Sequence, residues 1–499
     1  MKDSKLINLI KTFTPHEFRE LELFIESSYF NRGRDLSAFF KCLKKYYPGF
    51  EDNFREENFY EKLYPGKKYD KLKSKTLIHT LSSDMFKLCK EFLIQTGLNE
   101  DSHRREYYLL NRLREKRSYK EFEKISNNST ANNELPEKGG ALDFINQFYS
   151  AQNSMVYCIE KGDISGAVES IISQGECFAV AALIKGYRNH ELSIAAKTHN
   201  VIFRENLIDN LMSHLDSPGV LEVMKKNNDK FYPYVVVNYA AYLMMKHTED
   251  HKYYFEFKKM VDEYYFLFGQ SERFYLYAML ISYCSLQCLN DNTGIFGREQ
   301  FEIHKRSVEL GVYKNSENDI MDIVKFRNIA LSAFSLNETD WFETFVNDFI
   351  NELKPEYREN MRHFSLAYVH FGRKEFGKSL ENLILVHDDF FYFKMDAKRL
   401  LLLIYFELGY FDQANSLIKS IKEYIANTKD LSEYLKDRER IFIKVVNELL
   451  KVKESGNKKD IRILETEISK DIKLTFKKWL LEKVGELKGD RSPRKSCNS

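Results

Sequence analysis

The sequence predicts an all-α protein, and three observations carry that prediction. The chain of 499 residues contains only 8 Pro and 21 Gly, fewer turn-forming residues than a protein of many short strands requires. The stretch "TFTPHEFRELELFIESSYFN" at 12–31 combines apolar residues at helical spacing with a capping box of Thr14, Pro15 and Glu17. The third observation is a helix, corner, helix pattern in "IYFELGYFDQANSLIKSI" at 404–421.

Composition and charge describe an ordinary soluble chain. Hydrophobic residues make up 43% and charged residues 30% of the sequence, which is typical of folded proteins. The net charge of +2 indicates neither nucleic acid nor a membrane as partner. A chain of 499 residues is too long for one simple core, so several domains or a stack of repeated units is expected.

Cysteine usage and hydropathy predict a cytoplasmic location. The seven Cys residues are scattered without paired spacing, which predicts reduced thiols. The opening "MKDSKLINLIKTF" lacks the apolar core of a signal peptide. The longest uncharged apolar run, at 231–245, is too short to span a bilayer. We therefore expect no membrane partner.

The domain organisation follows from shifts in composition along the chain. A polar segment rich in Asn and Ser, "SNNSTANNELPEKGG", has the chemistry of a linker or a long surface loop. After residue 430 the helical stretches become strongly charged. The expected divisions are a helical N-terminal domain at 1–125, the linker at 126–140, helix pairs at 141–429, charged capping helices at 430–488 and a disordered tail at 489–499.

The corner at Gly409 recurs when the C-terminal half is compared with itself at a shift of 35 residues. Large apolar residues stay aligned in the first helix and at the corner, and a small or modest residue follows where two helices would cross. The aligned positions are Leu331, Leu366 and Leu401 in the first helix, Trp341, Phe376 and Phe411 at the corner, and Thr344, Ser379 and Ala414 at the crossing. This period predicts an α-solenoid of stacked antiparallel helix pairs.

These units resemble the tetratricopeptide repeat family over about 320–427. The best match is "LLLLIYFELGYFDQANSLIKSI", followed by "LAYVHFGRKEFGKSLENLILV", and "LSAFSLNETDWFETFVNDFI" is weaker. Two features depart from the family pattern. Leu402 stands where the family prefers Gly, Ala or Ser, and the usual boundary Pro occurs only as Pro355.

The resemblance implies a function for the first helix of each pair. In the family these helices line a concave groove that binds peptides or protein segments. The positions that the resemblance places there are Asn337, Phe364, Tyr368, Asp396 and Arg399. We therefore expect a non-enzymatic scaffold or adaptor with a protein partner. The oligomeric state is left open.

The main alternative is a helical nucleic-acid-binding protein or a ribonuclease. Arg358 and His363 fit the R-x₄-H spacing of HEPN-type helical ribonucleases, and Arg298 with His304 fits a looser form. Chance accounts for about two such pairings in a chain of this composition, so the spacing alone carries little weight. No phosphate-binding loop is present, and we expect neither a metal site nor a cofactor.

A cluster of five lysines at 67–75, "KKYDKLKSK", bears on the nucleic-acid alternative. Clustered cations can contact phosphates by displacing counterions. The simpler interpretation is the solvated face of a helix whose Tyr69 and Leu72 pack inward. We favour the simpler interpretation, and nucleic acid remains a less favoured partner.

Overall fold

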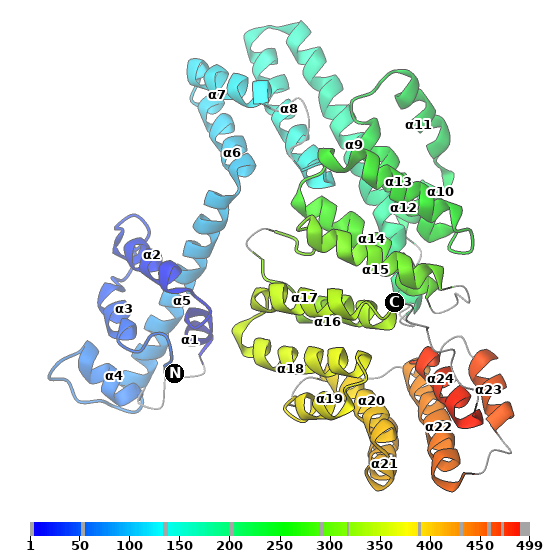
Figure 1. The fold of residues 1–499 in the computed structure, drawn as a ribbon. Coiled ribbons are helices and arrows are strands. Elements are labelled where there is room, and N and C mark those ends of the chain that lie inside the picture. The colour runs from blue at the N-terminus through cyan, green and yellow to red at the C-terminus, as the bar shows by residue number, and fades with distance from the viewer. Residues whose placement is uncertain are drawn as a thin grey trace. The chain divides into compact units, whose positions relative to one another are not determined.

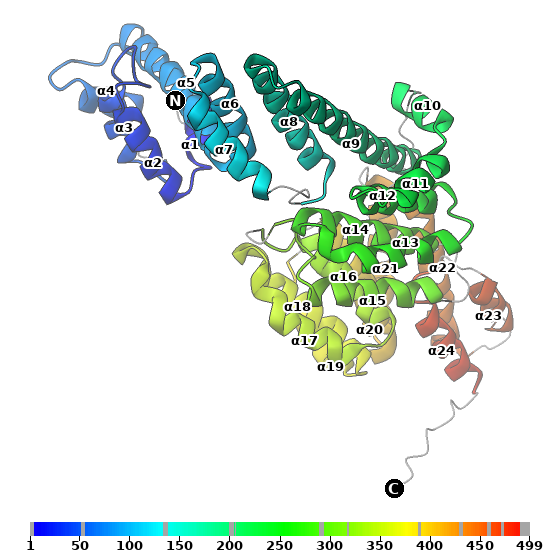
Figure 2. The same ribbon diagram turned by 90° about the horizontal axis from the view of Figure 1, so that it is seen from above.

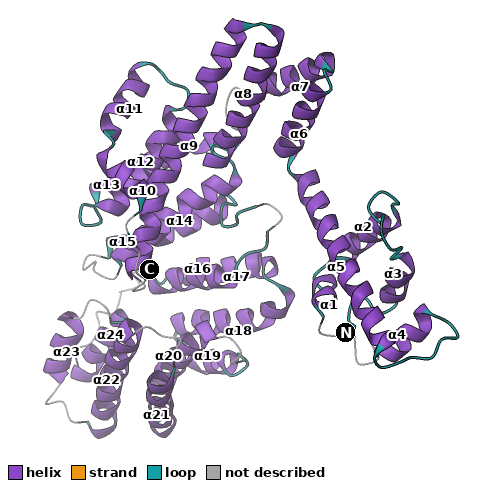
Figure 3. Ribbon diagram, turned by 180° about the vertical axis from the view of Figure 1, so that it is seen from behind, coloured by secondary structure: helices purple, strands orange, loops and turns teal. Residues whose placement is uncertain are grey.

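The computed structural model shows a helical chain throughout the part that it describes, which comprises residues 4–50, 55–132, 138–198, 204, 206–288, 294–316, 319–387, 391–428, 433–456, 461–470 and 474–489. Within these ranges 79% of the residues are helical, the helices number 24, and there is no strand (Figures 1 and 3). The helices pack in neighbouring pairs. The all-α prediction is therefore confirmed.

Helix follows helix with short connections. The N-terminal helices are α1 (Lys5–Ile10), α2 (Pro15–Glu26), α3 (Ser37–Lys44), α4 (Glu56–Leu63), α5 (Lys73–Glu100), α6 (Ser102–Glu115), α7 (Tyr119–Asn132), α8 (Ala141–Lys161) and α9 (Ile164–Thr198). The middle helices are α10 (Leu207–His214), α11 (Ser217–Lys226), α12 (Tyr232–Lys246), α13 (Lys252–Tyr264), α14 (Gln270–Gln287) and α15 (Ile295–Glu309). The C-terminal helices are α16 (Ile323–Ser335), α17 (Thr339–Phe349), α18 (Pro355–Gly372), α19 (Phe376–Leu383), α20 (Phe391–Leu408), α21 (Phe411–Asn427), α22 (Glu433–Ser455), α23 (Ile461–Lys470) and α24 (Lys477–Lys488).

The chain divides into two compact units. The first comprises Met1–Asn132 and Phe148–Gln174, and the second comprises Asn133–Gln147 and Gly175–Ser499. Helices α8 and α9 therefore each contribute residues to both units.

The segment expected to be a linker is helical at its start. Helix α7 continues to Asn132, so a loop beginning at residue 126 is wrong for 126–132. Asn and Ser disfavour a helix interior by only fractions of a kcal/mol, roughly 0.5 per residue, so a helix already under way continues through them. Residues 133–137 and 490–499, which belong to the expected linker and tail, lie outside the described residues.

The N-terminal unit has its own apolar core, built from α1–α5. Its second helix begins with the predicted capping box. The Thr14 hydroxyl accepts a hydrogen bond from the Glu17 N–H at 3.2 Å, and the Glu17 carboxylate accepts one from the Thr14 N–H at 2.7 Å. Pro15 occupies the first turn. The predicted capping box is therefore confirmed. It could be predicted from the sequence because its two partners lie three residues apart.

The pairs α16–α17, α18–α19 and α20–α21 turn at the same kind of corner. Each first helix is followed by a residue in the left-handed conformation: Asn337 (φ 60°), Lys374 (φ 63°) and Gly409 (φ 74°). The next N–H bonds to the carbonyl five residues back, from Glu338, Glu375 and Tyr410 at 3.0, 2.9 and 2.9 Å. This arrangement satisfies helix-end carbonyls that would otherwise lack a donor.

The three corners fix the register between the pairs, and it differs from the predicted one. Lys374 and Gly409 are 35 residues apart, but Asn337 and Lys374 are 37 apart. The predicted shift therefore holds between the second and third pairs and is two residues short for the first. The 3₁₀ turn at Ile350–Glu352, after α17, lengthens the first pair. Five residues past each corner the positions are Phe342, Ser379 and Ala414, all 0% exposed.

With this register, the residues that the shift of 35 aligned in the first pair do not all occupy the predicted positions. All six residues aligned in the first helices and at the corners are half-buried. Five of them pack against the core: Leu331, Leu401, Trp341, Phe376 and Phe411. The sixth is Leu366. Thr344 is exposed, so it does not stand at the crossing of two helices. Seven residues before each corner stand Ala330, Ala367 and Leu402, all 0% exposed.

A leucine introduced at the crossing tests this register. We expect Ala414→Leu to lower the free energy of unfolding by about 2 kcal/mol, because added volume in a packed crossing forces neighbouring side chains from their rotamers. Thr344→Leu, at the position aligned by the shift of 35 residues, should change it by less than about 0.5 kcal/mol. Urea denaturation followed by tryptophan fluorescence measures both. Equal losses in the two variants would contradict the corrected register.

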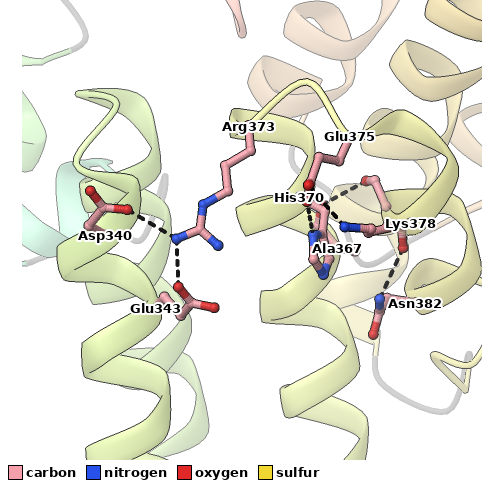
Figure 4. A network of polar contacts seen from close by, with 9 residues as sticks. Asp340, Glu343, Ala367, His370, Arg373, Glu375, Lys378 and Asn382 are labelled. Atoms are coloured by element: carbon pink, nitrogen blue, oxygen red, sulfur yellow. Dashed lines mark hydrogen bonds and ion pairs between the residues drawn. The ribbon is translucent and has the colours of Figure 1, made fainter.

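Polar contacts tie neighbouring pairs together at the corners (Figure 4). Arg373, just after α18, donates to Asp340 at 3.0 Å and Glu343 at 2.6 Å on α17. Within the next pair, the Ser379 hydroxyl donates to the Ala367 carbonyl at 2.7 Å. The exposed ion pairs contribute little stability, whereas the buried serine bond fixes the close approach of α18 and α19.

Helices α22–α24 complete the second unit. Helix α22 packs against α21, and α23 and α24 pack against α22 (Figure 2). Leu480 and Val484 of α24 are 0% exposed and share one apolar core with α16–α21. The charged C-terminal segment is therefore an integral part of the core.

Candidate functional site

A cavity of about 830 Å³ lies in the second unit, among α16, α18, α20, α22 and α24. Part of its wall is aromatic, formed by Phe334, Tyr368, Phe371, Phe376, Phe476 and Trp479. The remainder is largely polar and charged. A cavity of this size with apolar walls and a few fixed polar groups has the character of a binding site.

Four of the five predicted groove residues line this cavity: Asn337, Tyr368, Asp396 and Arg399. The fifth, Phe364, is 1% exposed, is not among the lining residues and packs against Tyr368 and Phe393. Its position on α18 points it into the core. Helical spacing places Phe364 and Tyr368 on one face, but only the longer Tyr368 side chain reaches the cavity.

A buried ionic network forms the polar wall. Asp396, 2% exposed, accepts hydrogen bonds from both Arg327 and Arg399. Arg399 also pairs with Glu439 of α22 at 3.1 Å, and the Tyr368 hydroxyl donates to the Asp396 carbonyl at 3.1 Å. Buried charges need such partners, because an isolated ion in a protein interior is costly. The network therefore holds five lining side chains in fixed positions: Arg327, Tyr368, Asp396, Arg399 and Glu439.

The network is not completely satisfied. Neither Glu439 Oε2 nor Arg399 Nε has a hydrogen-bond partner, although both atoms are buried. Burial raises the pKa of the Glu439 carboxyl, and the nearby Arg399 opposes that shift. Unpaired buried polar atoms are uncommon in folded proteins and occur at binding sites. Their position beside the cavity marks this wall as the part suited to polar recognition.

Helix α24 supplies a second set of polar contacts that the sequence reasoning missed. The Glu407 carboxylate accepts a hydrogen bond from Trp479 Nε1 at 2.7 Å and pairs with Lys483 at 2.8 Å. At the rim, Lys374 pairs with Glu482 at 2.6 Å. The charges of α24 were interpreted as a solvated cap. The one available signal was Trp479, an amphipathic ring among the charged and aliphatic residues of α24.

The R-x₄-H pair of the ribonuclease alternative has structural contacts. The Arg358 guanidinium donates to the carbonyls of Leu353 and Asn351, both at 2.9 Å, and so caps the end of the first pair. His363 Nδ1 lies 3.3 Å from the Asn382 side-chain oxygen on α19. A separation of five residues turns about 140° around a helix, so the two side chains leave α18 in different directions.

The second pairing also fails to form a shared site. Arg298 Nη1 contacts Glu338 at 2.7 Å. His304 is 2% exposed, and neither of its ring nitrogens has a hydrogen-bond partner. Burial, together with the charge of Lys325, lowers the pKa of His304 to about 4. A buried neutral imidazole of this kind is not placed to contact a nucleic acid.

The lysine cluster at 67–75 differs from the predicted helix face. Helix α5 begins only at Lys73, so residues 67–72 are not helical. Tyr69 packs against Tyr60 as expected, at 5.8 Å between ring centroids. Leu72 is 78% exposed, so the prediction that it packs inward is wrong. Helical spacing does not apply before the helix starts.

Two properties of the described residues bear on metal binding and on membranes. Among them no group of three or more His, Cys, Asp or Glu side chains could hold a metal ion. One helical stretch, Ile164–Asn189 of α9, is long and apolar enough to cross a bilayer by length and composition alone. A core helix of a soluble protein passes the same test, although only 28% of the most apolar part of this stretch is buried.

Comparison with known proteins adds no relative: no protein-family model, curated protein or solved structure matches this chain.

Proposed function

We propose that this chain is a non-enzymatic interaction scaffold, built on a solenoid of tetratricopeptide-like antiparallel helix pairs, that binds a segment of another protein. The common corner of α16–α17, α18–α19 and α20–α21 supports the repeat architecture. The same corner geometry occurs after α8, where Gly162 has φ 74° and the Asp163 N–H bonds to the Cys158 carbonyl at 2.8 Å. The partner would be a cytoplasmic protein.

The observation that carries the proposal is the cavity of about 830 Å³, whose wall holds four residues expected to line a groove. Its aromatic residues offer contact area at low entropic cost, and the buried network presents polar groups that are already ordered. Preorganised walls of this kind favour the binding of an extended or helical segment.

The charge of the cavity indicates the kind of segment. Six basic and four acidic side chains line it, an excess of two positive charges. Part of this excess lies at the start of α24, where Lys477 and Lys478 line the rim. We expect the bound segment to present acidic side chains toward α24 and an apolar side chain toward the aromatic wall.

Affinity purification of the full chain tests the proposal. Ser335 is exposed and lines the cavity, so Ser335→Trp should obstruct it, whereas Thr344→Trp places the same ring on an exposed part of α17. A protein partner should be recovered with the wild type and Thr344→Trp, survive nuclease treatment, and be reduced at least about tenfold by Ser335→Trp. Recovery of RNA or DNA alone, or a partner indifferent to Ser335→Trp, would overturn the proposal.

A further inference from the structure

The turn that precedes α5 exposes an aliphatic side chain in the middle of a cationic surface. Leu72 is 78% exposed. The five lysines around it, Lys67, Lys68, Lys71, Lys73 and Lys75, are all exposed. This basic turn, 67–75, belongs wholly to the first unit, and none of its residues lines the cavity.

Local hydrogen bonds hold Leu72 outward. The Asp70 carboxylate accepts hydrogen bonds from the N–H groups of Leu72 and Lys73 at 2.9 and 2.6 Å. The Ser74 hydroxyl accepts one from the Asp70 N–H at 3.0 Å. These bonds cap α5 and fix the turn, while Tyr69 anchors it to the core through Tyr60. The exposed leucine is therefore a feature of an ordered turn.

We propose that the basic turn docks on an anionic lipid bilayer, with Leu72 entering the interface and the lysines contacting the headgroups. An exposed aliphatic residue gains by leaving water at the level of the acyl chains. Each nearby lysine gains from the negative surface potential of the bilayer. The burial of Leu72 and the attraction of the lysines act together only on a surface with an anionic outer layer and an apolar interior.

The composition of the turn favours a lipid surface over nucleic acid. Residues 67–75 contain five Lys and no Arg, and Arg is the residue suited to bidentate recognition of phosphates and bases. The only aromatic residue in the turn, Tyr69, is half-buried against Tyr60 and is not offered for stacking on a base. The residue presented at the centre is aliphatic.

Acidic neighbours moderate the attraction without cancelling it. Asp70 lies within the turn, and Glu56 lies near Tyr69 and Lys75. Glu57 also acts on Tyr69, so five lysines against Asp70, Glu56 and Glu57 leave an excess of two positive charges. Binding should therefore be weak, reversible and sensitive to salt, as for other peripheral membrane contacts that lack a lipid anchor.

Vesicle sedimentation of the full-length protein tests this inference. Two vesicle types are used, phosphatidylcholine alone and phosphatidylcholine with added phosphatidylserine. The variants are Lys71→Glu/Lys73→Glu, Leu72→Ser, and the control Lys120→Glu/Lys124→Glu, which makes the same charge change at exposed positions of α7 in the same unit. Leu72 is the N-cap of α5, where serine is favoured, so Leu72→Ser should leave the fold intact.

We expect binding to the phosphatidylserine vesicles only, reduced at least about tenfold by the double lysine change, about threefold or more by Leu72→Ser, and less than about twofold by the control. Binding to both vesicle types, or binding that the lysine change leaves intact, would overturn the inference. So would an absence of binding to the phosphatidylserine vesicles, and lysine-dependent binding to RNA or DNA in its place would assign the turn to nucleic acid. These outcomes are independent of the proposed function, because the basic turn and the cavity share no residue. Ser335→Trp, which obstructs the cavity, should therefore bind vesicles as the wild type does.

Discussion

Replacing Arg399 with methionine is expected to lower the free energy of unfolding of the second unit by about 4 kcal/mol. Arg399 pairs with both Asp396 and Glu439, whose side chains are 3% and 9% exposed. Without the guanidinium, Glu439 loses a buried partner and Asp396 keeps only Arg327. Unpaired buried carboxylates are costly, so most of the expected loss arises from them.

Tryptophan fluorescence in urea measures this loss selectively, because Trp341 and Trp479 are the only two tryptophans and both belong to the second unit. Arg440→Met is the matched control. Arg440 forms exposed pairs with Asp437 and Glu433, so its loss should change the free energy of unfolding far less than the loss of Arg399 does. Adding Glu439→Gln to Arg399→Met should recover part of the stability. Similar losses in Arg399→Met and Arg440→Met would refute the importance of the buried network.

Acidification is expected to destabilise the second unit through His304, by up to about 3 kcal/mol. The pKa of His304 falls from 6.5 to about 4 on folding, so between these values the unfolded state binds more protons than the folded state. Stability therefore rises with pH in this window. The contribution is fully present above pH 6.5, is lost as pH falls toward about 4, and then levels off.

His304→Leu separates the effect of His304 protonation on stability from the effects of carboxylates that titrate near the same pH. At pH 7 the variant should be as stable as the wild type or more stable, because it removes two buried ring nitrogens without partners. As pH falls from 6.5 to 4, the gap between the two proteins should widen in favour of the variant. Parallel pH profiles, measured by urea denaturation, would show that His304 is not buried as described.

Local chemistry explains which parts of the fold could be predicted. The capping box at Thr14 and the corner at Gly409 depend on residues within a few positions of one another, so the sequence shows them directly. The equivalent corner residues in the neighbouring pairs are Asn337 and Lys374. Glycine and asparagine adopt the left-handed conformation more readily than other residues and lysine does not, so the corner at Lys374 is the one that its residue type does not mark.

The candidate site could be predicted only in part, for a physical reason. The repeat resemblance placed all four lining residues on the first helices, which supply one wall of the cavity. This is correct for Tyr368, Asp396 and Arg399, whereas Asn337 lies at the corner after α16. The opposite wall depends on pairings distant in sequence, such as Trp479 with Glu407, which are 72 residues apart. No local pattern encodes such a pairing, because a charged residue in a helix is usually solvated.

The basic turn shows a different limit of sequence prediction, because its composition could be predicted but the position of one side chain could not. Its lysines were evident from the sequence, but the position of Leu72 depends on where α5 begins, and helix boundaries are the least reliable part of a sequence prediction. Asp70 decides that boundary by capping the N–H groups of Leu72 and Lys73.

Site-specific photocrosslinking in the native cells tests whether the cavity binds a segment of another protein. A photoreactive residue is placed at Ser335 or Lys478, which line the cavity and are exposed, and at Thr344 or Lys419, which are exposed on the second helices of their pairs. We expect the same discrete protein adduct, resistant to nuclease, from both cavity positions and from neither control position. Adducts of equal yield at all four positions, or adducts removed by nuclease, would contradict it.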